Sequence, residues 1–249
     1  MSELAQRQDV EEAVNSALNP APPNLGFAPL ARERTRPVNF PPWFIDRCRQ
    51  AYLAVQLAEH GAPRENRVIG ISSAVHGEGK TSIAVGIATA IAADTSEPTI
   101  LVECDFASRV GFQDLFGLNR GPGLCEWLDG MERLRLVQAA PLENAFVLPA
   151  GDPGIDPARL VFRLTESHLI PRLKPSFKNI IIDLPPMINI AYSSLACRLA
   201  DRILLVARYG VTMMEDLEKA MFLLGQERVA GVVMNSYQPR TPAWLRRLL

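Results

Sequence analysis

A lysine and two hydroxyl side chains directly follow a glycine-bearing turn in one stretch of the chain. An apolar run at residues 68–71 leads into the turn at 72–79, and Lys80, Thr81 and Ser82 then open an alanine-rich segment of helical length. A strand, a glycine loop and a helix in this order form the setting of a phosphate-binding loop, in which backbone N–H groups at the helix N-terminus bind phosphate oxygens. The stretch therefore predicts a nucleotide site with ATP and Mg²⁺ as ligands.

Each position of this loop has a predicted role. Gly77 and Gly79 let the backbone turn tightly and point N–H groups inward. Lys80 is expected to reach the β- and γ-phosphates, and the Thr81 hydroxyl to bind magnesium. The full pattern G-x-x-x-x-G-K-[ST] has glycine where this chain has Ala74, so a plain turn into a helix stays open as an alternative. The candidate ATP-binding residues of the loop are Gly77, Glu78, Gly79, Lys80, Thr81 and Ser82.

Polar side chains stand at the ends of three further apolar runs. Glu103 and Asp105 end the run at 99–104, Asp183 ends 179–183, and Asn235 ends 230–235. Ligands of open parallel sheets bind beyond the carboxyl ends of the strands, so these groups are expected to converge on the loop. Asp183 is the candidate magnesium ligand, and Asp105 is expected to share the metal or to position a nucleophile. For each aspartate the alternative is a solvated or capping carboxylate at a strand end.

The predicted site combines these groups with the loop. Asn235 is predicted to read the adenine edge, with a simple turn residue as the equally open alternative. The candidate catalytic residues are Lys80, Glu103, Asp105 and Asp183, and the candidate magnesium ligands are Thr81, Asp105 and Asp183.

Composition excludes several classes of protein. The 249 residues carry a formal net charge of −1, which indicates no nucleic-acid partner. The four cysteines are scattered without C-x-x-C spacing, which favours reduced thiols over a disulfide framework or a zinc site. No apolar run is long enough to span a bilayer, and the polar start is unlike a secretory signal. We expect a cytoplasmic protein, and peripheral attachment at the inner face of the cell membrane through a partner stays open.

Apolar runs alternate with helical patterns along most of the chain. Near-continuous apolar strands separated by helices indicate a doubly wound, mostly parallel α/β sheet covered on both faces. Residues 1–42 are rich in proline and are predicted to be a mostly disordered lead, 43–237 a single P-loop domain, and 238–249 a short basic amphipathic tail. Strands are predicted at 68–71, 99–104, 145–148, 179–183, 202–207 and 230–235, and helices at 43–59, 80–93, 112–117, 124–128, 157–173, 190–199 and 213–226.

The order of these motifs resembles the cytoplasmic tyrosine kinases of bacterial capsule and exopolysaccharide assembly, which are relatives of the deviant-Walker partition and septum-placement ATPases. The resemblance covers about residues 43–237. It rests on ISSAVHGEGKTS, ILVECDF, DLFGLNRGPGLCEWLDG, FVLPAG, NIIIDLPPM, ADRILLVARYGVT and GVVMN. It implies a P-loop NTPase fold, Mg-ATP as cofactor, phosphoryl transfer to tyrosine, and a membrane chain-length (co-polymerase) protein as partner.

The resemblance also assigns the site by position. Glu103 and Asp105 look like the second acidic (Walker A′) motif, with Glu103 as the base, and Asp183 looks like the Walker B aspartate. Asn235 looks like the adenine contact. Partition ATPases carry a lysine five residues before the loop lysine, where this chain has Val75, so the resemblance favours the kinase branch.

Three departures point to weaker activity than in the family. The arginine of the second acidic motif is replaced by Ala107, although Arg109 follows. A helix motif that joins protomers is kept only as Asp46 and Arg49, so we expect weak self-association through 43–59; Tyr52 replaces its second arginine. The tail has one tyrosine, Tyr237. The predicted function is therefore a tyrosine kinase, or alternatively a weakened nucleotide-binding regulator or a plain ParA/MinD-type ATPase.

Overall fold

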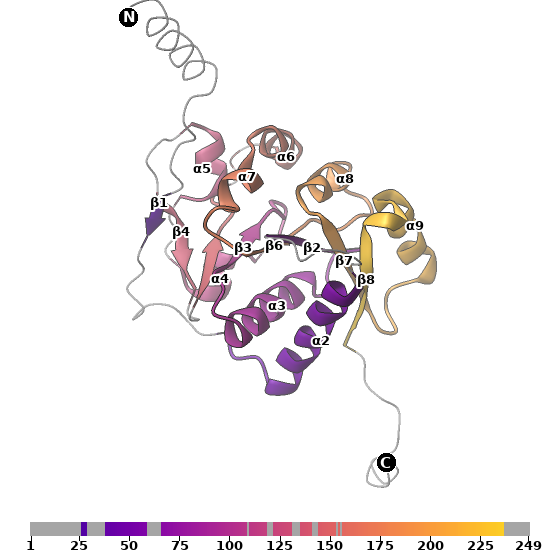
Figure 1. Cartoon of the computed structure of the whole chain (residues 1–249). Helices are drawn as coiled ribbons and strands as arrows, with labels where there is room; N and C mark the ends of the chain where they lie inside the picture. Colours follow the sequence, from indigo (N-terminus) through magenta and orange to yellow (C-terminus); the bar gives the residue numbers. More distant parts are fainter. Residues whose placement is uncertain are drawn as a thin grey trace, which may run out of the picture.

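An eight-stranded sheet forms the centre of the part of the chain that the structure describes. The structure, a computed structural model, describes residues 26–28, 38–58, 66–108, 110–118, 122–130, 135–140, 144–152, 154 and 156–236. The strands are β1 (Gly26–Ala28), β2 (Arg67–Ser73), β3 (Thr99–Glu103), β4 (Arg135–Ala139), β5 (Ala145–Leu148), β6 (Asn179–Asp183), β7 (Arg202–Arg208) and β8 (Val229–Asn235). Their order in the sheet is β1-β4-β5-β3-β6-β2-β7-β8 (Figure 1).

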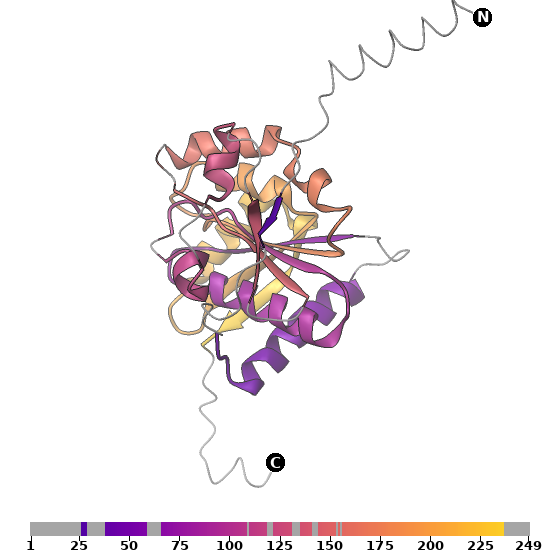
Figure 2. The same ribbon diagram turned by 90° about the vertical axis from the view of Figure 1, so that its left-hand side faces the viewer.

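Helices cover both faces of this sheet. They are α2 (Pro42–Ala58), α3 (Lys80–Asp94), α4 (Phe112–Phe116), α5 (Leu124–Leu128), α6 (Pro157–Glu166), α7 (Leu169–Leu173), α8 (Ser193–Ala196) and α9 (Met214–Leu224), with short 3₁₀ turns at Cys197–Leu199 and Gln226–Arg228. Helices α2, α3 and α4 pack on one face and α5 to α9 on the other, each over its own buried apolar layer. Figures 1 and 2 show the two layers and the twist of the sheet between them.

The pairing is parallel throughout the described sheet except between β4 and β5. This confirms the predicted doubly wound, mostly parallel α/β fold. Strand β6 lies at the centre, and its register sets Asp183 opposite Ile71 of β2 on one side and Glu103 of β3 on the other. The carboxyl ends of β2, β3 and β6 therefore meet at one point of the sheet edge.

Helix α3 is held almost wholly inside the molecule, because α2 packs across its outer side. Its buried side chains are mostly alanine and isoleucine, which lets the helix lie close to the sheet. At Gly86 the two helices approach so closely that an added Cβ would stand 2.5 Å from the Cys48 sulfur and 2.7 Å from the Phe44 ring. All four cysteines are free and buried, and burial raises the pKa of Cys48 to about 12. Among the described residues, no helix combines the length and the hydropathy needed to cross a bilayer.

Several boundaries differ from the sequence prediction. The segment predicted as one helix at 157–173 is two helices, because His168 adopts a left-handed φ of 54° between them; the proline at 171 lies inside the first turn of α7, where it is tolerated. Strand β4 was not predicted. Neither was β1, whose three residues lie in the lead that was expected to be disordered and pair in parallel with β4. For those three residues the expectation of disorder is wrong, because β4 offers them a sheet edge.

Candidate nucleotide site

The glycine loop joins β2 to α3 with two glycines in the left-handed region. Gly77 has φ of 81° and Gly79 has φ of 91°, conformations that side chains with a Cβ adopt only with strain. Gly79 stands immediately before the first residue of α3, so the free N–H groups of the helix N-terminus open onto the loop. An added Cβ at Gly79 would stand only 2.2 Å from the Asn235 side-chain nitrogen, whereas one at Gly77 would meet nothing within 4 Å.

Glu78 holds the loop from inside. Its carboxylate is buried and accepts hydrogen bonds from the backbone N–H of Val75 at 2.9 Å and from the Thr212 hydroxyl. Thr212 in turn accepts from the backbone N–H of Arg208 at 2.7 Å. The loop is thus fastened to the connection between β7 and α9. Sequence reasoning missed Thr212; the only signal was its place between a strand end and a helix start.

Asn235 fastens the loop from a second side. Its amide nitrogen donates to the backbone oxygen of Glu78 at 2.8 Å, and its side-chain oxygen accepts from the backbone N–H of Ser236 at 2.8 Å. The adenine contact predicted for Asn235 stays a prediction; in the structure, its amide nitrogen joins the end of β8 to the loop, and its side-chain oxygen binds the backbone of the next residue.

Lys80 lies buried between the two aspartates. Its ammonium nitrogen is 2.6 Å from Asp105 Oδ2 and 3.7 Å from Asp183 Oδ1, and the residue is only 7% exposed. Burial opposes the charge of Lys80, but the negative charges of Asp183 and Asp105 outweigh burial, so the pKa of Lys80 is raised. The lysine is therefore a charged group that already neutralises carboxylates in the absence of phosphate.

Two carboxylate oxygens of the site are buried without a hydrogen-bond partner. They are Asp105 Oδ1 and Asp183 Oδ1, while Asp183 Oδ2 accepts from the Thr81 hydroxyl at 2.7 Å. Burial raises the pKa of Asp183 to about 6, against the opposing effects of Lys80 and Thr81. Unpartnered buried oxygens are costly, so these two atoms suit a site that is completed by a bound group.

A hydroxyl and carboxylate oxygens at one point are ligands that suit Mg²⁺. No cluster of three His, Cys, Asp or Glu side chains that could hold a metal is found among the described residues. This agrees with the way magnesium binds at nucleotide sites, through one or two protein carboxylates together with phosphate oxygens and waters. Of the predicted ligands, Thr81 contacts Asp183, and Lys80 contacts both Asp183 and Asp105; their binding of magnesium stays a prediction.

Glu103 is oriented differently from the two aspartates. Its carboxylate is buried and accepts from the backbone N–H groups of Phe112 and Ala150, each at 2.9 Å, so it ties β3 to the start of α4 and to the end of β5. Burial raises its pKa to about 7, although the two N–H groups favour the charged form. These contacts describe a structural bridge, and the predicted role of Glu103 as base stays a prediction.

The remaining predicted positions are quickly placed. Ser82 lies exposed in the first turn of α3. Arg109 and Tyr237 lie outside the described residues, as do the tail at 238–249 and most of the lead at 1–42.

The α2 residues predicted to join protomers are engaged within the chain. Arg49 donates to both oxygens of Asp94 at the end of α3 and also to Asp46 one turn away. Tyr52 is buried rather than exposed: its hydroxyl donates to Asn179 Oδ1 at 3.2 Å and accepts from Arg67 and Gln56. These side chains fasten α2 to its own domain, which the spacing of the helix could not reveal.

Comparison with known proteins gives several relatives. No protein-family model matches the sequence. Tyrosine-protein kinase Wzc of Salmonella typhimurium is 27% identical over 176 residues, which cover 69% of this chain and 24% of that protein. Tyrosine-protein kinase CpsD of Streptococcus pneumoniae is 28% identical over 195 residues, which cover 77% of this chain and 86% of that protein. The chain thus matches about a quarter of the length of Wzc and most of CpsD.

Solved structures share the fold. The kinase domain of the Escherichia coli tyrosine kinase Etk superposes with a TM-score of 0.70 at 24% identity, over 84% of this chain and 85% of that one. The cell division ATPase MinD of Pyrococcus furiosus superposes with a TM-score of 0.55 at 25% identity, over 69% of this chain and 73% of that one. The chain is accordingly a homologue of the bacterial tyrosine-protein kinases Wzc, Etk and CpsD, built on the fold of P-loop ATPases such as MinD.

Proposed function

We propose that the chain binds Mg-ATP and acts as a tyrosine-kinase-like protein of capsule or exopolysaccharide biosynthesis. It transfers phosphate to tyrosine, or regulates the polymer-export machinery through its nucleotide state. One observation carries this proposal: Lys80, Thr81, Asp105 and Asp183 converge at the carboxyl ends of three adjacent strands, and two buried carboxylate oxygens there have no hydrogen-bond partner. The named relatives are tyrosine-protein kinases, which fits the same chemistry.

Each residue of the site has a role in this proposal. Lys80 exchanges its contact with Asp105 for an oxygen of the β- or γ-phosphate, and the N–H groups of the loop and of α3 bind the remaining phosphate oxygens. Thr81 and Asp183 hold Mg²⁺, with Asp105 beside them; the ion supplies neutralisation of the charge on the phosphates. Glu78 keeps the loop in shape through its contacts with Val75 and Thr212.

The transfer step follows from these positions. The tyrosine hydroxyl oxygen bonds to the γ-phosphorus while the bond from that phosphorus to the β,γ-bridging oxygen breaks, and ADP leaves with the electron pair. The hydroxyl proton passes to a carboxylate. We propose Asp105 for this role, because its Oδ1 is unpartnered, whereas both oxygens of Glu103 accept backbone N–H groups.

A weakened nucleotide-binding regulator is the second candidate. Ala107 stands where the kinases carry an arginine, and the carboxylate of Glu103 is bound within the chain. Both features lie on the catalytic side, while the groups that hold ATP are in place. A plain MinD-type ATPase is the third candidate, and Val75 in place of the signature lysine stands against it.

The partner and location follow from the same family. We propose that a membrane chain-length protein of polysaccharide export docks the chain at the inner face of the cell membrane. Self-association through α2 is weak in this proposal, because Arg49 and Tyr52 are already engaged by Asp94 and Asn179 of the same chain.

Incubation of the full chain with Mg-ATP labelled on the γ-phosphate tests the proposal. Phosphotyrosine and free phosphate are measured separately, with and without the membrane partner, and Asp183→Asn is the control for chemistry at this site. Labelled tyrosine that needs Asp183 supports the kinase. Nucleotide binding with neither product, in the presence of the partner, supports the regulator. Failure to bind ATP contradicts all three candidates.

A further inference from the structure

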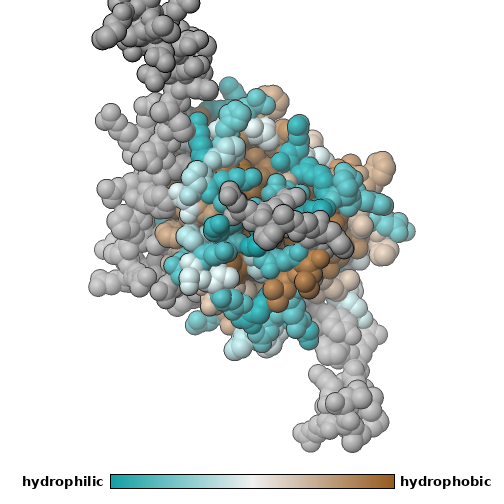
Figure 3. Space-filling view, viewed as in Figure 1, coloured by the Kyte–Doolittle hydropathy of each residue, from teal (hydrophilic) through white to brown (hydrophobic). Residues whose placement is uncertain are grey.

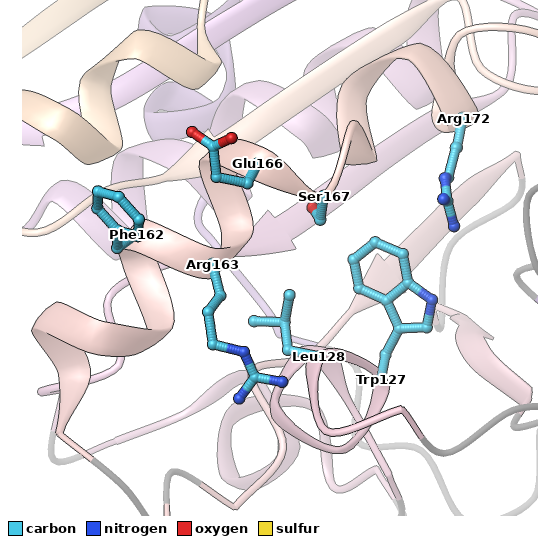
Figure 4. Close-up of a pocket in the computed structure, with 7 residues that line it drawn as sticks. All are labelled: Trp127, Leu128, Phe162, Arg163, Glu166, Ser167 and Arg172. Atoms are coloured by element: carbon cyan, nitrogen blue, oxygen red, sulfur yellow. The ribbon is translucent and has the colours of Figure 1, made fainter. Parts of the chain in front are cut away.

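A second concave site lies on the sheet face opposite α2 and α3. It is a cavity of about 400 Å³ between α5, α6 and α7, lined by Trp127, Leu128, Phe162, Arg163, Glu166, Ser167 and Arg172 (Figure 4). We call it the α5–α7 pocket. None of the residues predicted to bind ATP lines it, so it requires an explanation of its own.

The lining of the α5–α7 pocket combines apolar and cationic groups. Figure 4 shows Trp127 facing Arg172, whose guanidinium carbon lies 5.3 Å from the centre of the indole ring. Arg163 pairs with Asp129 at 2.7 Å and stays a third exposed, and Phe162 of α6 is 60% exposed. The charged residues of the lining are two arginines, Arg163 and Arg172, and one carboxylate, Glu166. This surface suits an acidic peptide with apolar side chains.

The chain holds a segment of that chemistry near the pocket. Residues 1–25, which lie outside the described residues, contain four carboxylates and one arginine. Within them Val10, Val14 and Leu18 recur every four residues, which would place them on one side of a helix, with Glu11 at the border of that side.

Strand β1 fixes where this segment leaves the domain. Gly26 pairs with Arg135, the first residue of β4, and Arg135 lies seven positions after Leu128 of the pocket. Those seven residues span at most about 25 Å. The link at 19–25 holds three prolines and, in an extended polyproline conformation, reaches about 22 Å, and a helix over 9–18 adds about 15 Å. The segment can therefore reach the pocket.

We propose that residues 9–18 of this chain dock in the α5–α7 pocket, with Val10 and Val14 against Trp127 and Phe162 and the carboxylate of Glu11 facing Arg163. The short tether to β1 raises the local concentration of the segment to the millimolar range, so modest affinity is enough. The pocket is thereby a binding site for an acidic amphipathic helix that the chain itself supplies.

Fluorescence of Trp127 tests the docking in the full chain. The substitutions Trp43→Phe and Trp244→Phe leave Trp127 as the one tryptophan. Adding Val10→Asp and Val14→Asp removes the burial of two apolar side chains and places two carboxylates against the apolar lining, so the docked population should fall at least about tenfold. We expect the emission of Trp127 to move to longer wavelength and its quenching by acrylamide to increase, with unchanged far-UV circular dichroism.

Charge exchange identifies the partners. Glu11→Lys should expose Trp127 in the same way, and the further change Arg163→Glu should restore its protection. Arg159→Glu on the same helix α6 does not line the pocket and should not restore it. Unchanged Trp127 emission in the Val10→Asp, Val14→Asp variant would overturn the proposal. So would a protection that depends on protein concentration, since the occupant would then be the segment of a second copy.

Discussion

Replacing Lys80 by alanine should destabilise the nucleotide-free protein far more than the loss of a loop lysine usually does. The side chain is buried against Asp105 and Asp183, so its removal leaves two buried carboxylates without their cation. Breaking a buried ion pair by removing one partner costs about 3–5 kcal/mol. We expect the free energy of unfolding to fall by that amount at pH 8, measured by urea denaturation. Lys219→Ala, which removes an exposed lysine of α9, is the control.

The pH dependence gives the sharper test of this reasoning. Lys80 lowers the pKa of Asp183, so the variant should have a pKa above the value of about 6 in the parent chain. At pH 5 the Asp183 carboxyl of the variant is then neutral and needs no cation, and the loss of stability should shrink. A loss below about 1 kcal/mol at pH 8, or an equal loss at both pH values, would refute the buried arrangement.

Three further outcomes follow from the described contacts. Gly79→Ala should lose about 1–3 kcal/mol more stability than Gly77→Ala in thermal unfolding. Both glycines have positive φ, but only at Gly79 would the added Cβ meet an atom, at 2.2 Å. Equal losses would be contrary to the loop geometry. Burial raises the pKa of Glu103 from 4.5 to about 7, so the folded state holds this proton more tightly than the unfolded state. As the pH rises between those two values, this group should therefore lower the free energy of unfolding by up to about 1.4 kcal/mol per pH unit. Urea denaturation from pH 5 to 8 should show that slope flattened by Glu103→Gln. Arg49→Ala should loosen α2 and speed amide hydrogen exchange there, as Asp94→Ala should also do, without changing the oligomeric state.

The sequence predicted the strands that carry the site and missed β1 and β4, the two strands at one edge of the sheet. Strands β2, β3 and β6 are near-continuous apolar runs with polar ends, because both of their faces are buried. Strand β4 reads RLVQA and β1 reads GFA, short segments without a long apolar run; β4 forms by pairing with β5, and β1 by pairing with β4.

The site was predicted by residue type, whereas its contacts required the fold. The positions of Lys80 and Asp183 follow from the loop motif and from the strand end. That Lys80 is paired with Asp105, and that Glu103 binds the backbone of Phe112 and Ala150, depends on strand register and loop paths that no local pattern encodes.

Tyr52 shows the same limit on a helix. The sequence showed only that it replaces the second arginine of the helix motif, whereas in the fold its hydroxyl is buried and bonded to Asn179.

Titration of the full chain with ATP by calorimetry, with and without Mg²⁺, tests the central claim that this is a magnesium-dependent nucleotide site. Thr81→Ala removes the hydroxyl that contacts Asp183, and Thr89→Ala, farther along α3 with its hydroxyl bonded to its own helix, is the matched control. We predict that binding by the parent chain and by Thr89→Ala strengthens with Mg²⁺, and that Thr81→Ala loses at least about tenfold of that gain, or 1.4 kcal/mol. Equal affinity for ATP with and without Mg²⁺ in the parent chain, or an unchanged gain in Thr81→Ala, would contradict the assignment.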